Sequence, residues 1–215
     1  MELLIHKLIS QELSMQIYSE LTDNSCSWQD GKKTAGSYAA NVKNNFQLDR
    51  NSIESKNLSA KIINFLKEDS LVKSFSLPKN IHGLMFTKAI SGQGYGMHVD
   101  NTFMSSGRSD LSFTLFLSDP NSYEGGELCI QTLQESKEIK LSGGEMVIYP
   151  STSLHGVEKV TQGERIVCVG WIESYISSNE DRNLLFGLDA GAKGLLAEHG
   201  QSDELNLIFQ AYNNL

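Results

Sequence analysis

The stretch Leu111-Ser-Phe-Thr-Leu-Phe-Leu117 alternates apolar and polar side chains and is rich in residues that favour strands. Two more short apolar runs each follow a pair of glycines: Glu127-Leu-Cys-Ile-Gln131 and Glu145-Met-Val-Ile-Tyr149. The segments 157–160 and 166–172 continue the series. Short strands at near-regular spacing, separated by turn signals, predict a β-sandwich or a β-barrel.

Helical patterns flank this β-rich centre. Ser10 is a candidate N-cap for a helix whose buried stripe is Leu13, Ile17 and Leu21. A second helix is expected over 52–68, with strand and loop over 26–50. Leucines at helical spacing predict helices again in 176–215.

The expected fold class is therefore α+β with a mainly β core. We expect one domain over 1–175, with its core at about 80–175, and a helical segment over 176–215 packed on that core. The length of 215 residues suits this organisation.

Composition narrows the function classes. The chain has 18 basic and 26 acidic residues, a net charge of −8, so no basic stripe is expected to bind a nucleic-acid backbone. Its charge favours a neutral or cationic substrate. Three scattered cysteines, no apolar stretch long enough to cross a bilayer and no signal-peptide pattern favour a cytoplasmic protein that binds no membrane.

The segment Tyr95-Gly-Met-His-Val-Asp100 contains the most informative pair of side chains, His98 and Asp100. On an extended strand, residues two apart point to the same face and can share one metal ion. His155, 57 residues later, is the candidate third ligand. Two histidines and one carboxylate are the ligand set of non-haem Fe(II) oxygenases. Zn(II) takes similar ligands, and the simplest alternative is a turn histidine bonded to a nearby carboxylate.

Arg165 stands ten residues after His155, at the start of the apolar strand Ile166-Val-Cys-Val-Gly-Trp171. If its side chain points inward, the buried guanidinium needs an anion, and its planar fork suits a carboxylate. The alternative is an arginine at a strand end that pairs with Glu164 or Glu158 in water.

Together these residues resemble the pattern of Fe(II)- and 2-oxoglutarate-dependent dioxygenases, and more narrowly the bacterial PKHD-type hydroxylases, relatives of prolyl 4-hydroxylases. The matching phrases run over most of the chain. They are Val42-Lys-Asn-Asn45, Tyr95-Gly-Met-His-Val-Asp100, Asp110-Leu-Ser112, Thr114-Leu-Phe-Leu-Ser-Asp-Pro120, Tyr123-Glu-Gly-Gly-Glu-Leu128, Tyr149-Pro-Ser151, Ser153-Leu-His155 and Leu185-Phe-Gly-Leu-Asp189.

The resemblance implies a double-stranded β-helix, or jelly roll, with a metal at its mouth. It implies that His98, Asp100 and His155 bind Fe(II), and that Arg165 pairs with the far carboxylate of 2-oxoglutarate. Ser112 and Trp171 are expected to line the co-substrate pocket. Related enzymes often carry a tyrosine on the strand before the His-x-Asp motif, where this chain has Lys88-Ala89-Ile90.

The implied reaction hydroxylates a C–H bond, possible targets being a prolyl or other amino-acid side chain, and releases succinate and CO2. It uses Fe(II), 2-oxoglutarate and dioxygen, with ascorbate as a candidate reductant. The substrate class stays open between a small molecule and a peptide or protein. Rival functions are a non-catalytic, cupin-like binding protein and a zinc hydrolase.

Three further segments each allow two interpretations. The polar segment 101–110 is either a surface loop or a lid beside the metal. Lys43-Asn44-Asn45 is either a polar turn or part of the pocket mouth. The leucines of the tail either pack on the core or form a homodimer interface.

Overall fold

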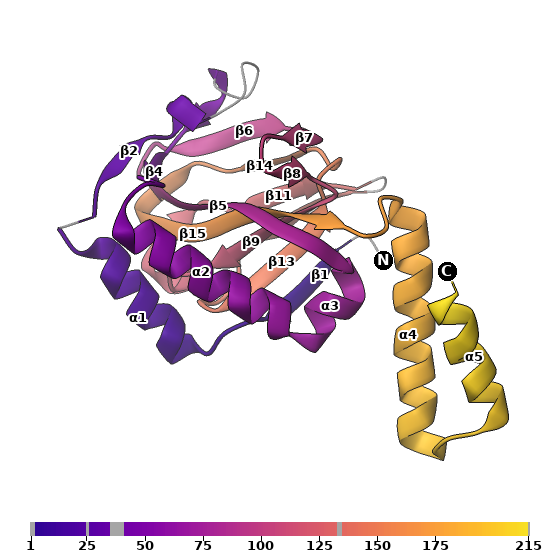
Figure 1. The fold of residues 1–215 in the computed structure, drawn as a ribbon. Coiled ribbons are helices and arrows are strands. Elements are labelled where there is room, and N and C mark those ends of the chain that lie inside the picture. Colours follow the sequence, from indigo (N-terminus) through magenta and orange to yellow (C-terminus); the bar gives the residue numbers. More distant parts are fainter. Residues whose placement is uncertain (1–2, 25, 35–40, 133–134, 215) are drawn as a thin grey trace.

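The computed structural model describes residues 3–24, 26–34, 41–132 and 135–214. Two β-sheets face each other, and helices cover the outer face of the larger one (Figure 1). The larger sheet has the strand order β1-β13-β9-β15-β5-β4-β2, with β10 paired to β15, and the smaller has the order β12-β11-β14-β6-β3. This pair of sheets, with helices outside, agrees with the expected α+β class and jelly roll.

The strands of the larger sheet are β1 (Leu4–Lys7), β2 (Trp28–Asp30), β4 (Phe46–Leu48), β5 (Pro78–Ile90), β9 (Leu111–Phe116), β10 (Tyr123–Gly125), β13 (Glu145–Pro150) and β15 (Val160–Ser174). Those of the smaller sheet are β3 (Lys43–Asn44), β6 (Gly94–His98), β11 (Leu128–Gln131), β12 (Ser136–Ile139) and β14 (His155–Val157). A separate hairpin pairs β7 (Phe103–Met104) with β8 (Gly107–Arg108). Short 3-10 turns span Gly31–Thr34 and Pro120–Ser122.

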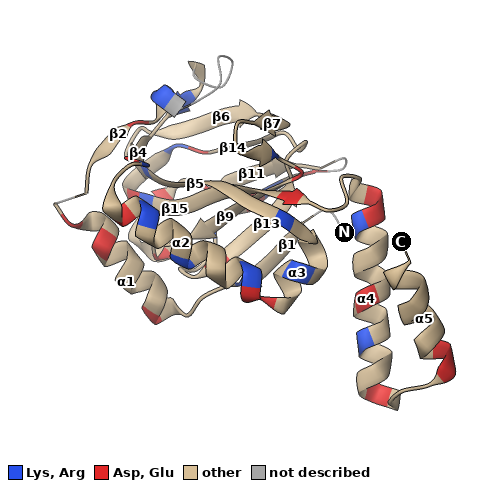
Figure 2. Cartoon of the chain, viewed as in Figure 1, with Lys and Arg blue, Asp and Glu red and all other residues tan. Residues whose placement is uncertain are grey.

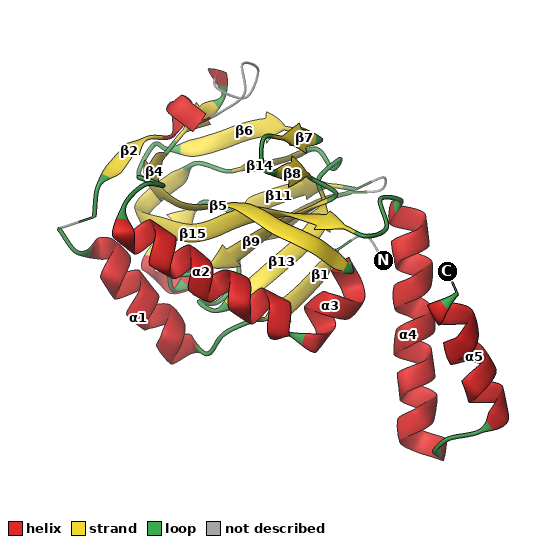
Figure 3. Cartoon of the chain, viewed as in Figure 1, coloured by secondary structure: helices red, strands yellow, loops and turns green. Residues whose placement is uncertain are grey.

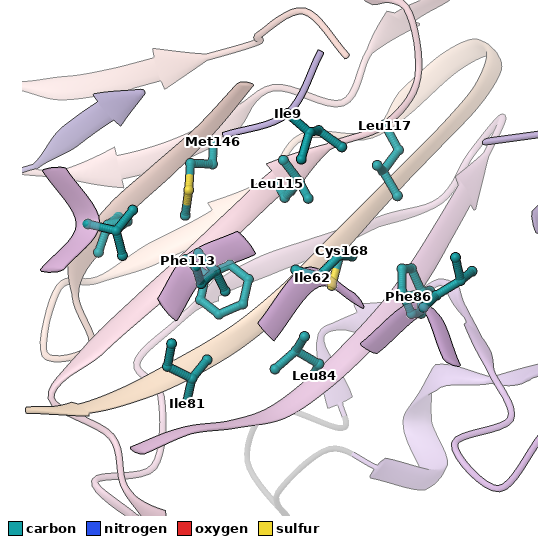
Figure 4. Close-up of a cluster of buried hydrophobic side chains, with 14 of the residues drawn as sticks. Ile9, Ile62, Ile81, Leu84, Phe86, Phe113, Leu115, Leu117, Met146 and Cys168 are labelled. Atoms are coloured by element: carbon teal, nitrogen blue, oxygen red, sulfur yellow. The ribbon is translucent and has the colours of Figure 1, made fainter. Parts of the chain in front are cut away.

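Side chains along the central strands point alternately into the hydrophobic core and into the cavity between the sheets. On β9, Leu111, Phe113 and Leu115 pack in the main hydrophobic cluster, while Ser112 and Thr114 line the cavity between the sheets. This is the period of two that a half-buried strand requires. Figure 4 shows the apolar side of the same strands, where Phe113, Leu115, Met146 and Cys168 meet Ile62 from a covering helix.

The covering helices are α1 (Gln11–Thr22), α2 (Ile53–Glu68) and α3 (Ser70–Ser76) (Figure 3). The side chain of Ser10 accepts from the backbone N–H of Leu13, as an N-cap should. Leu58, Ile62 and Leu66 supply the buried stripe of α2. The expected N-terminal helices are therefore confirmed to within one residue at their starts.

The tail forms two helices, α4 (Asn179–His199) and α5 (Asp203–Asn213), which pack against each other. Their contact with the rest of the fold lies near the start of α4, where Phe186 meets Phe75 edge-to-face at 5.4 Å. Beyond that contact the pair extends away from the sheets (Figure 1). Leu195 and Leu196 are exposed, so these two leucines do not pack on the core, which was one of the two alternatives for the tail. The domain boundaries and the homodimer remain predictions.

Charge is mixed along the helices. Figure 2 shows acidic and basic residues interspersed on α2 and α4, a pattern typical of solvated helix faces. No helix in the described part of the chain is long and apolar enough to span a membrane.

Candidate active site

Three potential metal ligands converge between the sheets. His98 ends β6, His155 begins β14, and the two residues are partners across the antiparallel ladder. Asp100 lies two residues beyond the end of β6, so the expected extended strand stops at His98. One ligand atom from each side chain lies within 4.8 Å of the others.

Backbone carbonyls orient both imidazoles. His98 Nδ1 donates to the carbonyl of Gly96 at 2.8 Å, and His155 Nδ1 donates to that of Ser153 at 2.9 Å. A carbonyl can only accept, so each Nδ1 carries a hydrogen and each Nε2 is the nitrogen left to face the cavity. The two Nε2 atoms lie 3.9 and 3.7 Å from oxygens of Asp100. Burial, helped by the neighbouring His155, lowers the pKa of His98 to about 4, so this imidazole is neutral at pH 7.

Two donors fix the carboxylate of Asp100. Ser112 Oγ donates to Asp100 Oδ2 at 2.6 Å, and Trp171 Nε1 donates to the same oxygen at 2.9 Å. Ser112 also shares a hydrogen bond of 2.8 Å with Ser151 Oγ. Ser112 and Trp171 both line the cavity, and these hydrogen bonds orient the carboxylate of Asp100. Their contact with the co-substrate remains a prediction.

Aromatic rings support the histidines. Tyr95 stacks on His98 with ring centres 3.7 Å apart, and Tyr149 meets His155 edge-on at 5.0 Å. Burial raises the pKa of the Tyr149 phenol well above its ordinary value. Sequence reasoning had not assigned a role to either tyrosine, although both lie in the motifs that carried the resemblance.

A cavity of about 840 Å³ opens onto these residues, and Arg165 is part of its wall. Arg165 is 3% exposed, and its Nε and Nη2 atoms have no hydrogen-bond partner among the described residues. Burial lowers the pKa of this guanidinium, and the nearby Tyr123 and Tyr149 act in the opposite direction. A buried guanidinium with two unpartnered nitrogens is suited to bind an anion that enters the cavity.

The alternative pairing of Arg165 is not what the structure shows. Glu164 instead accepts a hydrogen bond of 2.7 Å from the hydroxyl of Tyr18. Glu158 lies against Cys129. The even spacing of Arg165 and Trp171 on β15 turns both side chains to the cavity, as the strand pattern predicted.

The residues at the departure from the family pattern face opposite ways. Ala89 lines the cavity and is the partner of Arg165 across the ladder. Lys88 points to the other face, with its ammonium 4.5 Å from the ring centre of Trp28. The wall beside Arg165 therefore carries a methyl group at this position.

The segment 101–110 contributes to the cavity. Asn101, Phe103 and Ser106 are among its lining residues, which favours the interpretation of this segment as a lid beside the metal over that of a surface loop. His82 on β5 makes two hydrogen bonds to the hairpin of β7 and β8. Its Nε2 donates to the carbonyl of Arg108 at 3.0 Å, and Ser106 Oγ bonds its Nδ1 at 2.8 Å. Lys43 and Asn45 also line the cavity, which agrees with the interpretation of Lys43-Asn44-Asn45 as part of the pocket mouth.

The ligand set fits the group that the sequence implied. Two imidazoles and a carboxylate suit Fe(II), and a buried guanidinium with two unpartnered nitrogens suits one end of a dicarboxylate. Both features lie on one cavity, which has room for a co-substrate and part of a substrate.

Comparison with known proteins gives the same assignment. Residues 84–173 match the model of the 2OG-Fe(II) oxygenase superfamily. PKHD-type hydroxylases of Prochlorococcus marinus strains MIT 9211 and MIT 9313 are 67% and 66% identical, and each alignment covers 100% of this chain and 97% of the relative.

Solved structures show the same fold. A prolyl-4-hydroxylase from Pseudomonas putida aligns with a TM-score of 0.59 at 17% identity, over 81% of this chain and 94% of that one. A prolyl hydroxylase from Trichoplax adhaerens aligns with a TM-score of 0.53 at 13% identity, over 86% of each chain. The chain belongs to the PKHD-type hydroxylases, within the 2OG-Fe(II) oxygenase superfamily, and is a 2-oxoglutarate-dependent dioxygenase that uses Fe(II) and O2.

Proposed function

We propose that His98, Asp100 and His155 hold Fe(II), and that Arg165 binds the distal carboxylate of 2-oxoglutarate. The reaction that these residues serve hydroxylates a C–H bond of a second substrate and releases succinate and CO2. One observation carries the proposal: three ligand atoms within 4.8 Å of one another face the cavity that also contains the unpaired guanidinium of Arg165.

Fe(II) and 2-oxoglutarate, when bound, supply the oxidative chemistry, and the chain supplies placement and the exclusion of water. The carbonyls of Gly96 and Ser153 keep each Nε2 free to bind the metal. A third ligand from Asp100 leaves other coordination positions open for co-substrate and dioxygen. Because Ser112 and Trp171 both bond Oδ2, they restrict how the carboxylate of Asp100 can rotate.

Arg165 selects the co-substrate. Its buried guanidinium can form two parallel hydrogen bonds with a carboxylate, which a neutral group of the same size cannot replace. The charge-assisted hydrogen bonds and the removal of an unpaired buried cation both favour binding.

For the second substrate we infer a prolyl or other amino-acid side chain, or a small molecule of similar size. The support is the fold, which this chain shares with prolyl hydroxylases, together with a cavity large enough for such a group. We also infer a cytoplasmic location, because Cys26, Cys129 and Cys168 are all free thiols, as a reducing compartment requires. The absence of a nucleic-acid or membrane partner remains a prediction.

The test follows conversion of 2-oxoglutarate to succinate by NMR, with Fe(II), ascorbate and air. Asp100→Ala and His98→Ala should each reduce the rate to the level of free Fe(II) in solution, with unchanged circular dichroism. Full turnover in either variant would remove the proposed ligand set. Succinate formed with Fe(II) but not with Zn(II) separates the proposal from a zinc hydrolase, which forms none with either metal.

A further inference from the structure

A second group of cations lines the cavity away from Arg165. Lys43, on β3, is only 4% exposed, and Arg50 follows the end of β4. Both side chains contribute to the cavity wall. Among the described lining residues, Asp100 is the one carboxylate, and the proposed metal site uses it.

A series of ring contacts connects the proposed metal ligands with both cationic regions. The series consists of the rings of Tyr149, His155, His98 and Tyr95, whose successive centre-to-centre distances are 5.0, 4.4 and 3.7 Å. The ammonium of Lys43 lies 5.3 Å from the ring centre of Tyr95. Arg165 acts electrostatically on Tyr149, at the first end of this series. The proposed ligands His98 and His155 are thus the middle members of a series that begins near Arg165 and ends near Lys43.

The charges around Lys43 favour an incoming anion. Burial and the nearby Arg50 lower the pKa of Lys43 to about 8, while Asp100 and Asp30 act against this shift. A metal bound by Asp100 would offset the charge of that carboxylate, and Lys43 and Arg50 would then repel each other with less compensation. An anion placed between them relieves that repulsion.

Apolar side chains surround the same part of the opening. Met97, Val99 and Phe103 are all exposed and all line the cavity. Met97 and Val99 flank the proposed ligand His98 in the sequence, and Phe103 follows Asp100 by three residues. Exposed apolar groups gathered at a cavity mouth indicate a surface that an apolar ligand covers.

We propose that the second substrate carries a carboxylate, which Lys43 and Arg50 bind, next to an apolar group that packs against Met97, Val99 and Phe103. The inference deepens the proposed function and rests on it. It also departs from the expectation drawn from the net charge of −8, because the charge of the cavity wall has the opposite sign.

The test uses protein loaded with Mn(II), which is paramagnetic, and with 2-oxoglutarate. N-acetyl-leucine and its amide, N-acetyl-leucinamide, are matched probes that differ in charge. NMR relaxation of the probe methyl protons by Mn(II) reports binding near the metal. We expect saturable relaxation of the acid, with the amide binding at least about tenfold more weakly, as expected for the loss of a charge-assisted hydrogen bond.

Two substitutions and a control assign the effect. Lys43→Met and the milder Arg50→Gln, at an exposed position, should each weaken binding of the acid about tenfold and leave that of the amide unchanged. Lys56→Met, at an exposed position of α2, should bind both probes as the unsubstituted protein does. An N-acetylated tripeptide ending in leucine shows whether the carboxylate belongs to a peptide C-terminus or to a small molecule.

The inference is overturned if acid and amide bind equally, if neither binds, or if the preference survives both substitutions. Displacement of 2-oxoglutarate by the acid also overturns it, because the acid would then occupy the Arg165 site. Relaxation of 2-oxoglutarate by Mn(II) is followed in the same samples and tests the proposed function separately. If that relaxation is absent, the proposed function fails, and calorimetry with metal-free protein still decides the preference for acid over amide.

Discussion

The indole N–H of Trp171 donates to Oδ2 of Asp100 across 2.9 Å, joining β15 of the larger sheet to the loop after β6 of the smaller one. The hydrogen bond therefore links the proposed metal ligand Asp100 to a central strand of the larger sheet. The hydroxyl of Ser112 donates to the same oxygen. A carboxylate held by two donors is already oriented before a metal binds, which lowers the entropic cost of binding.

Trp171→Phe keeps an aromatic ring in place and removes this donor. We expect Fe(II) affinity to fall about 10- to 100-fold, the usual cost of losing a partner of a metal ligand. Calorimetry with Mn(II) or anaerobic Fe(II) measures the change. Trp28→Phe is the matched control, since the Trp28 indole donates to a backbone carbonyl away from the site. Equal affinity in the two variants would contradict the orienting role.

Arg165→Met removes the buried cation while keeping an apolar chain of similar length. The dissociation constant of 2-oxoglutarate should rise at least about 100-fold, corresponding to about 3 kcal/mol for a broken buried pair. Without co-substrate the variant should be as stable as the unsubstituted protein or more so, because the guanidinium has two unpaired buried nitrogens.

Thermal unfolding with and without 2-oxoglutarate checks both parts of the Arg165 prediction. The unsubstituted protein should gain stability from the ligand, and the variant should not. An unchanged affinity would place the co-substrate carboxylate elsewhere in the cavity.

The metal-free protein should lose stability in acid through His98. Burial lowers its pKa to about 4, whereas in an unfolded chain the value is about 6.5. Between these values the unfolded chain binds the proton and the folded protein does not, so the free energy of unfolding falls as pH falls. This group alone contributes a slope of up to about 1.4 kcal/mol per pH unit.

Urea unfolding in EDTA across this pH range measures that slope for the unsubstituted protein and for His98→Gln. The variant should show a shallower acid loss. If the two slopes coincide, His98 does not titrate as the buried environment requires.

His82→Leu should loosen the hairpin of β7 and β8. The imidazole bonds Ser106 and the carbonyl of Arg108, and leucine can replace neither bond. Hydrogen exchange of residues 103–108 should become faster than in the unsubstituted protein, because both hydrogen bonds from His82 to the hairpin are lost. Unchanged exchange would show that other contacts fix the hairpin.

The strands and helices that followed a clear period were predictable from sequence. Local alternation placed Ser112 opposite Phe113, and the N-cap Ser10 marked the start of α1. Sequence reasoning did not single out β1 as a strand, because its residues form an ordinary apolar run until β13 pairs with them. It also gave β15 too short a span, since 160–165 becomes strand through pairing with β5 and β10.

The site was predictable where family motifs named its residues, and less so where the fold decides the geometry. The hydrogen bond from Trp171 to Asp100 joins residues 71 apart, which no local pattern encodes. The positions of Lys43 and Arg50 depend on the crossing from β3 to β4, that is, from one sheet to the other. The exposure of Leu195 could not be predicted, because helical periodicity marks an apolar face whether or not another element covers it.

The most direct measurement is an anaerobic titration of the metal-free protein with Fe(II) and then 2-oxoglutarate, followed by visible absorption. We expect a saturable charge-transfer band when 2-oxoglutarate chelates the bound Fe(II), and no band in His155→Ala. Protein that binds Fe(II) but gives no band on addition of 2-oxoglutarate, or a band that persists in His155→Ala, would contradict this expectation.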